Sequence, residues 1–264
     1  MLQYFQKKLK IGIIGCGAIG TILAKAIDRD LKGAKIVALS DQDLGRANAL
    51  SSQLRSRPKV LDGKGLIKKS DLVIEAASGK IVAEIAARTF AMKKDLMCMS
   101  VGGFIGNEHL IEIAKKRNCN LYFPSGAIAG LDAVKAAKVG KITKVTLVTT
   151  KPPKSLSGYE NAKKKKVVFE GNVTQAVKLF PQNINVSAAL SLAGIGAKKT
   201  KVKIIVDPSV KVNSHEIIVE GDFGKISTKT ENKPSPINPK TSYLAILSAI
   251  AMVKRIVGNV EIGS

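Results

Sequence analysis

The 264-residue sequence contains few aromatic residues, cysteines and acids, and the shortages exclude several classes of protein. Tryptophan is absent and aromatic residues make up 4% of the chain, without the aromatic–glycine motif of an RNA-binding sheet, so we expect no specific nucleic-acid partner. The three cysteines are widely spaced and form no C-x-x-C pair, which argues against a disulfide framework and against a metal site. We therefore expect Cys16, Cys98 and Cys119 to be reduced thiols in a cytoplasmic protein.

Long apolar runs are also absent. None approaches the ~20 residues that cross a bilayer, and the first residues carry no apolar segment typical of a signal peptide. We therefore expect no membrane partner. Hydrophobic residues still make up 45% of the chain, which is typical of a globular protein with a buried core.

Acids are outnumbered by bases, 20 to 43, which gives a formal net charge of +23. The lysines are scattered over the whole length, and the tight run Lys163–Lys166 is the exception. Such a positive potential favours small anionic ligands, including a dicarboxylate or a pyrophosphate.

A glycine-rich segment is the most informative feature present. Three glycines at G-x-G-x-x-G spacing lie between a strand-like run and a helix-like run. The first permits a tight turn, the second lets a pyrophosphate approach the backbone, and the third lets the helix pack close to the sheet. The helix N-terminus adds free N–H groups and a positive dipole end. We therefore predict dinucleotide binding by Gly15, Gly17, Ala18, Ile19 and Gly20.

Asp41 ends the next apolar run, 21 residues after Gly20. An acid at this position accepts hydrogen bonds from the adenosine ribose diol. It favours NAD over NADP, because a 2′-phosphate would meet a negative charge. Arg46 and nearby lysines leave NADP as an alternative.

Strand-like and helix-like stretches alternate over residues 1–124, which predicts an α/β Rossmann domain with a parallel sheet. The expected strands are 10–14, 35–40, 71–77, 96–101 and 120–123, with helices at 43–55, 81–93 and 107–117. Ligands bind such sheets at the carboxyl ends of the strands. We therefore expect Ala77, Ser78 and Gly79 near the cofactor, with ordinary turn chemistry as the alternative.

Residues 125–237 read as an α+β domain that serves substrate binding and dimerisation, and 238–264 as a C-terminal segment. The expected strands are 141–150, 202–207, 216–221 and 223–229, in a mixed or antiparallel sheet, with helices at 174–179 and 181–197 and a loop over 151–166. A helix over 243–257 is expected to pack back on the first domain. An exposed sheet face in the second domain suggests a homodimer.

The motifs follow one another in an order that resembles the L-aspartate dehydrogenase family over nearly the whole chain. They are G-C-G-A-I-G at 15–20, S-D at 40–41, S-V-G-G at 100–103, S-G-A-I-A-G-L-D at 125–132, P-Q-N-I-N-V at 181–186, D-P at 207–208, N-S-H-E-I at 213–217, G-D-F-G at 221–224 and N-P-K-T-S at 238–242. The glycine motif is shared with many dehydrogenases, whereas the later motifs are far more specific.

The resemblance implies NAD(P)-dependent oxidative deamination of L-aspartate, in which a hydride passes to the nicotinamide. Iminoaspartate then either hydrolyses to oxaloacetate and ammonia or enters NAD biosynthesis. The resemblance places the catalytic histidine at His215 and cofactor contacts at Ala127 and Asn185, with Asn183 as the competitor for the last role.

Histidine is scarce, with only His109 and His215 in the chain. We expect His109 to be solvated at the start of a surface helix. His215, expected just before a strand, has a residue type that suits proton transfer at neutral pH. It could deprotonate the amine, activate the water that attacks the imine, hold a carboxylate if protonated, or serve only as a structural residue.

Aspartate carries two carboxylates, so the site needs anion-binding groups. The helix start at 238–242, with Lys240 and Thr241, is one candidate, and an ordinary N-cap is the alternative. Ser125 and Gly126, after the fifth strand, and Asn183 complete the predicted substrate-binding residues.

Two other functions fit parts of the sequence. One is another two-domain NAD(P) oxidoreductase, although Ser100–Gly102 stands where sugar-type dehydrogenases carry Glu-Lys-Pro. The other is a basic NAD-binding protein without turnover, for which His215 would be inert and polyanion affinity strong.

Overall fold

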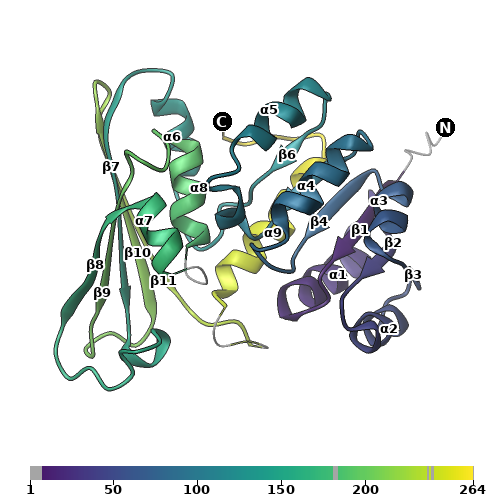
Figure 1. The fold of residues 1–264 in the computed structure, drawn as a ribbon, viewed down its shortest axis with the longest axis horizontal. Helices are drawn as coiled ribbons and strands as arrows, with labels where there is room; N and C mark the ends of the chain where they lie inside the picture. Colours follow the sequence, from purple (N-terminus) through teal and green to yellow (C-terminus); the bar gives the residue numbers. More distant parts are fainter. Residues whose placement is uncertain (1–7, 181–183, 237, 239–240, 264) are drawn as a thin grey trace. The chain divides into compact units, whose positions relative to one another are not determined.

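The computed structural model describes residues 8–180, 184–236, 238 and 241–263, which form two compact units. The first unit comprises the described residues up to Pro124 together with Ala249–Glu261. The second comprises Ser125–Ser248 with Ile262 and Gly263. Each unit has its own sheet and its own buried core (Figure 1).

The first unit is a parallel Rossmann sheet with the strand order β3-β2-β1-β4-β5-β6. Its elements are β1 (Leu9–Ile14), α1 (Ala18–Asp30), β2 (Ala34–Ser40), α2 (Leu44–Gln53), β3 (Lys59–Val60), α3 (Gly63–Lys69), β4 (Leu72–Glu75), α4 (Val82–Ala91), β5 (Asp95–Cys98), the 3-10 helix η1 (Val101–Phe104), α5 (His109–Lys116) and β6 (Leu121–Tyr122). The sheet reverses its order between β1 and β4. Dinucleotides bind at this reversal in such sheets.

Alternation along β1 explains how helices come to cover both faces. Ile11 and Ile13 point into a core shared with α1 and α2, and this core also buries Ala249 and Val253 of helix α9 (Tyr243–Val257). Gly12 lies on the other face, against Leu66 of α3. The predicted α/β class and the return of the C-terminal helix to the first domain are therefore confirmed.

The second unit is an α+β layer with a mixed sheet in the order β11-β10-β7-β9-β8. Its elements are α6 (Leu131–Ala137), β7 (Ile142–Lys151), the 3-10 helix η2 (Pro153–Ser155), β8 (Lys166–Asn172), α7 (Val173–Leu179), α8 (Asn185–Ala193), β9 (Lys201–Val206), β10 (Asn213–Gly221) and β11 (Gly224–Asn232). Strands β7 and β9 are parallel, and the other neighbours are antiparallel.

One face of this sheet is covered by helices, which lie together on its right-hand side in Figure 1. Val134 of α6 and Leu190 of α8 pack there on Val145 and Leu147 of β7 and on Ile217 of β10. Along β7 and β10, the residues with odd numbers face this core and those with even numbers face away. This alternation decides which polar side chains become buried.

Several predicted boundaries were wrong. Residues 59–69 form β3 and α3, which were not predicted because the two elements are short and weakly patterned. The expected strand at 96–101 ends at Cys98, before η1. The helix expected over 181–197 is α8, which begins at Asn185 among the described residues.

The position of His215 differs most. It lies inside β10, because Asn213 and Ser214 already pair with Asn232 and Glu231 of β11. Local propensity does not reveal pairing between segments so far apart in sequence. No helix in the described ranges has both the length and the apolar character needed to cross a bilayer.

Candidate functional site

The glycine loop between β1 and α1 has the geometry of a phosphate cradle. Gly15 has φ +100°, and a Cβ at this position would lie 2.5 Å from the carbonyl oxygen of Ala76. A Cβ at Gly20 would collide with the carbonyl oxygen of Gly15. Gly17 instead faces open space, and no side chain caps the α1 N-terminus there. The first two features hold the turn against β4, while the third leaves free N–H groups for an anion.

Ala18 and Ile19 form the first turn of α1, and both are half-buried. The structure therefore brings together the five residues predicted from the glycine motif.

Asp41 follows β2 and reaches the glycine loop. One of its carboxylate oxygens accepts the N–H of Cys16 at 2.6 Å, and the other accepts the N–H of Asp43 at 2.9 Å. The acid is thus fixed beside the loop, and its remaining lone pairs are available to a ribose diol. The nearby Arg46 is exposed, and its guanidinium lies 3.7 Å from the Asp43 carboxylate.

Glu75, at the end of β4, is a buried acid that the sequence analysis missed. Its Oε1 accepts the N–H of Ala77 at 2.8 Å and the hydroxyl of Ser100 at 2.9 Å. Its Oε2 accepts the Ser100 N–H at 3.0 Å and the Cys98 thiol at 3.2 Å. The carboxylate thereby joins the loops that follow β4 and β5. An acid within an otherwise apolar strand was the available signal.

The predicted cofactor loop after β4 is exposed at Ala77, Ser78 and Gly79. The Ser78 hydroxyl accepts the N–H of Lys80 at 3.3 Å, and the Ser78 carbonyl accepts the N–H of Ile81 at 3.1 Å. These bonds form the turn that leads into α4. The loop also lies at the carboxyl edge of the sheet, as the glycine loop and Asp41 do.

All three cysteines are free, as predicted. Burial and the neighbouring Asp41 raise the pKa of Cys16 to about 11. Burial and the Glu75 carboxylate raise the pKa of Cys98 well above its ordinary value. Both side chains are therefore neutral thiols at pH 7, without nucleophilic character.

In the second unit, His215 is buried on the helix-covered face of the sheet, with 7% of the residue exposed. Its Nδ1 lies 2.9 Å from Oγ1 of Thr149, the residue opposite on β7. Burial and the nearby charge of Lys151 lower the pKa of His215 to about 4. The imidazole is therefore neutral at pH 7 and able to accept a proton. His109 is exposed at the start of α5, as predicted.

Lys151 is a second buried polar group on this face, with 6% of the residue exposed. It follows Thr149 by two positions on β7, so the side chains of both residues share the face of His215. Burial lowers the pKa of Lys151 to about 8. The sequence analysis assigned residues 151–166 to a loop and gave Lys151 no role.

Ala127 is anchored to strand β11 near His215. Its carbonyl accepts the hydroxyl of Thr230 at 2.8 Å and the side-chain N–H of Asn232 at 3.0 Å. Thr230 is the β11 partner of His215, and its hydroxyl also lies 3.4 Å from the carbonyl oxygen of His215, so Ala127 and His215 both adjoin this β11 residue. The Asn232 amide oxygen also accepts the Ser242 hydroxyl at 2.8 Å.

Two neighbours of Ala127 were also predicted to be site residues. Gly126 has φ +69°, and its N–H donates to the Ser248 hydroxyl at 3.0 Å. A Cβ on Gly126 would lie 3.7 Å from Val186, so this segment adjoins the first turn of α8, where Asn185 is exposed. Ser125 is half-buried.

The predicted anion site before α9 is only partly described. Asn183 and Lys240 lie outside the described residues. Thr241 forms a turn in which its N–H donates to Asn238 at 3.0 Å and its carbonyl accepts from Ser235 at 2.7 Å. Its neighbour Ser242 belongs to the Asn232 network described above.

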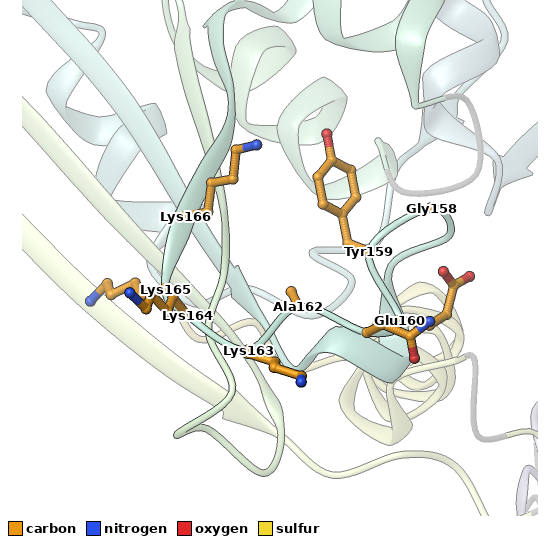
Figure 2. A pocket seen from close by; sticks show the side chains of 9 residues that line it. Gly158, Tyr159, Glu160, Ala162, Lys163, Lys164, Lys165 and Lys166 are labelled. Carbon is orange, nitrogen blue, oxygen red and sulfur yellow. The ribbon is translucent and has the colours of Figure 1, made fainter.

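The second unit also has a pocket of about 640 Å³ lined by residues 158–166 (Figure 2). In this view, the side chains of Lys164 and Lys165 point away from Tyr159. The ammonium of Lys165 pairs with Asp207 at 3.5 Å. This pocket includes none of the predicted site residues.

Family comparisons agree with the division into two units. Residues 15–124 match the family described as the NAD-binding domain of homoserine dehydrogenase, and residues 132–256 match the C-terminal domain of aspartate dehydrogenase. The geometry of the glycine loop and of Asp41 fits the same nucleotide, so the prediction of NAD use is confirmed.

Similar proteins cover nearly the whole chain. The L-aspartate dehydrogenases of Methanosarcina barkeri and Methanocaldococcus jannaschii are 46% and 42% identical to it, over 97% of this chain and 100% of theirs. The crystal structure of aspartate dehydrogenase from Thermotoga maritima matches with a TM-score of 0.80 and 29% identity, over 97% of this chain and 100% of that one. A myo-inositol dehydrogenase from Lactobacillus casei (TM-score 0.60, 15% identity, 95% of this chain and 86% of that one) shares the fold alone. The predicted resemblance is confirmed, and the chain belongs to the L-aspartate dehydrogenase family.

Proposed function

We propose that this protein catalyses the NAD(P)-dependent oxidative deamination of L-aspartate to iminoaspartate, which yields oxaloacetate and ammonia or feeds NAD biosynthesis. The observation that carries the proposal is the neutral, buried His215, which lies in the unit that matches the aspartate dehydrogenase C-terminal domain. NAD, when bound, accepts the hydride that leaves the substrate α-carbon.

His215 takes the role of general base in this proposal. Nδ1 and the Thr149 hydroxyl lie within hydrogen-bond distance. In this proposal Nδ1–H is the donor, so the free lone pair lies on Nε2, which accepts the proton of the substrate ammonium group. The amine then expels hydride from the α-carbon and becomes an iminium. Water adds to the iminium carbon, and collapse of the adduct gives oxaloacetate and ammonium.

The cofactor contacts of this proposal are a set of backbone and small-residue positions. Those in the first unit are Gly15, Gly17, Ala18, Ile19, Gly20, Asp41, Ala77, Ser78 and Gly79, and those in the second are Ala127 and Asn185. For the substrate we retain Ser125, Gly126 and Thr241, together with Asn183 and Lys240. The arrangement of the glycine loop and the anchored carbonyl of Ala127 support these assignments.

We further propose a cytoplasmic homodimer. The free cysteines suit a reducing compartment. The second-unit sheet face that points away from the helices carries the half-buried apolar residues Val148, Ile205 and Ile218, which a second copy could cover. Sedimentation equilibrium tests the dimer: a mass near 56 kDa supports it, and one near 28 kDa contradicts it.

NADH formation from NAD and L-aspartate tests the main proposal, with L-glutamate, L-alanine and D-aspartate as controls. We expect turnover of L-aspartate alone. If the protein binds NADH but turns over none of these amino acids, the aspartate assignment fails and an NAD-binding protein without turnover takes its place.

A further inference from the structure

Lys151 is the one lysine or arginine that is buried among the residues that the structure describes. Lysine is almost never fully buried without a reason, because its ammonium loses solvation there. Its backbone is fixed at the end of β7, where its carbonyl accepts the N–H of Asp207 at 2.9 Å. The burial of Lys151 is therefore set by its fixed place in the sheet.

The register places Lys151 beside His215. Thr149 is opposite His215 in the β7–β10 ladder, and Lys151 is the next residue of β7 on the same face. Diagonal neighbours in such a ladder have Cα atoms about 7–8 Å apart, within reach of a lysine side chain. The effect of the Lys151 charge on the pKa of His215 agrees with this proximity.

Asn213 supplies an independent observation. It precedes His215 by two positions on β10 and so shares its face. Its amide Oδ1 is shut off from solvent and has no hydrogen-bond donor within the described part of the chain. A buried acceptor without a donor is costly, and it indicates a ligand that donates one.

We propose that Lys151 and Asn213 form the amino-acid recognition site beside His215, where the Lys151 ammonium binds a substrate carboxylate and the Asn213 amide oxygen accepts a hydrogen bond from the substrate amine. This inference rests on the proposed function and deepens it. The pair supplies one contact for a carboxylate of an α-amino dicarboxylate and one contact for its amine. The amine on Asn213 lies next to the base that deprotonates it.

The charges give Lys151 a second effect. Burial and, to a smaller extent, the positive charge of Lys151 lower the pKa of the free imidazole of His215. A bound carboxylate offsets this charge, so His215 becomes a stronger base when substrate is present. The lysines at 163–166, drawn in Figure 2, do not supply this coupling, because all four are exposed.

The test is calorimetric binding of L-aspartate and of succinate to the NADH-saturated, full-length protein. Succinate has both carboxylates but no amine, so it separates the two contacts. In Lys151→Met we expect both ligands to bind at least about 30-fold more weakly, because one partner of a buried ion pair is removed. In Asn213→Leu we expect only L-aspartate to lose affinity.

Lys203→Met is the matched control. It removes the same charge from β9 of the same sheet, but this lysine is 35% exposed and pairs with Glu170 at the surface, 3.1 Å away. Exposed pairs contribute little, so both affinities should stay unchanged. Unchanged NADH affinity and circular dichroism show that each variant is folded. If Lys151→Met does not fold, Asn213→Leu carries the test.

Equal binding of both ligands by wild type and Lys151→Met would overturn the carboxylate contact. Equal weakening of succinate and L-aspartate in Asn213→Leu would overturn the amine contact. Binding is measured without turnover, so its outcome is distinct from that of the proposed function. A wild type that binds L-aspartate through Lys151 but forms no NADH would contradict only the reaction.

Discussion

The candidate sites of the two units differ in the chemical groups that form them. In the first unit, glycines and backbone N–H groups lie at the ends of parallel strands, where they need no particular side chain. In the second, buried polar side chains project from one face of neighbouring strands: Thr149 and Lys151 on β7 and His215 on β10.

The difference has physical consequences. A phosphate site made of backbone N–H groups requires that the phosphates come close to the backbone. Adding one methyl group to a glycine can therefore abolish binding there. A buried side-chain site depends on charge and on hydrogen-bond partners, so it responds to isosteric replacement and to pH. Variants in each unit should therefore fail in different ways.

The largest effect is expected for His215→Asn. Removing a general base typically lowers kcat by about 10²–10⁴-fold, while NADH binding, assigned mainly to the first unit, should be unchanged. The rate of NADH formation gives kcat, and fluorescence titration with NADH gives the affinity for the cofactor. His109→Asn, on the exposed start of α5, is the control and should keep full activity. Near-normal turnover in His215→Asn would assign this histidine a structural role.

The next effect is a dependence of stability on pH caused by Lys151. Its pKa is near 10.5 when unfolded and about 8 when folded, so between these values the unfolded chain binds more protons. The free energy of unfolding should therefore rise by about 3 kcal/mol between pH 8 and pH 10.5 because of this group alone. Urea unfolding of wild type and Lys151→Met at several pH values isolates the contribution. Parallel pH profiles for the two proteins would contradict a desolvated Lys151.

A smaller effect is expected for two glycines of the glycine loop, of which one should affect stability and the other NADH affinity. Gly20→Ala places a methyl group against the Gly15 carbonyl oxygen and should lower the free energy of unfolding by about 1–3 kcal/mol. Gly17→Ala meets no protein atom within 4 Å, so stability should be kept while NADH affinity falls. Thermal unfolding with and without NADH measures both. If Gly17→Ala bound NADH normally, the phosphates would not lie at Gly17.

The smallest effect is expected for Asp41→Asn. The amide keeps one acceptor but loses the charge, so KM for NAD should rise about tenfold, and KM for NADP should fall relative to it. Asp43→Asn is the control, because asparagine also caps helices well and Asp43 only caps α2. An unchanged ratio of NADP to NAD use in Asp41→Asn would remove Asp41 from the ribose site.

Sequence reasoning succeeded where the signal was local. The glycine spacing and the acid 21 residues later required only one strand–turn–helix unit, and the structure places Asp41 against the loop. The apolar period of α9 gave the bounds Tyr243–Val257, as observed. Glu75 was missed because its partners lie more than twenty residues away, Cys98 at the end of β5 and Ser100 just after it.

In the second unit the signals were not local. The resemblance singled out His215, but not its burial or its bond to Thr149, which depends on a ladder between residues 66 positions apart. Lys151 looked like one more lysine at the start of a basic loop, and only the register of β7 showed it to be buried beside the histidine. Asn213 belonged to a quoted motif without a role, because an unmatched acceptor is visible only in three dimensions.

The most direct measurement compares Gly17→Ala with Lys151→Met, using the Kd for NADH and the KM for L-aspartate at saturating NAD. The division of labour between the units predicts that Gly17→Ala raises only the first and Lys151→Met only the second. If each variant raised both constants by similar factors, cofactor and substrate would share one set of contacts, and the assignment of separate roles to the two units would be wrong.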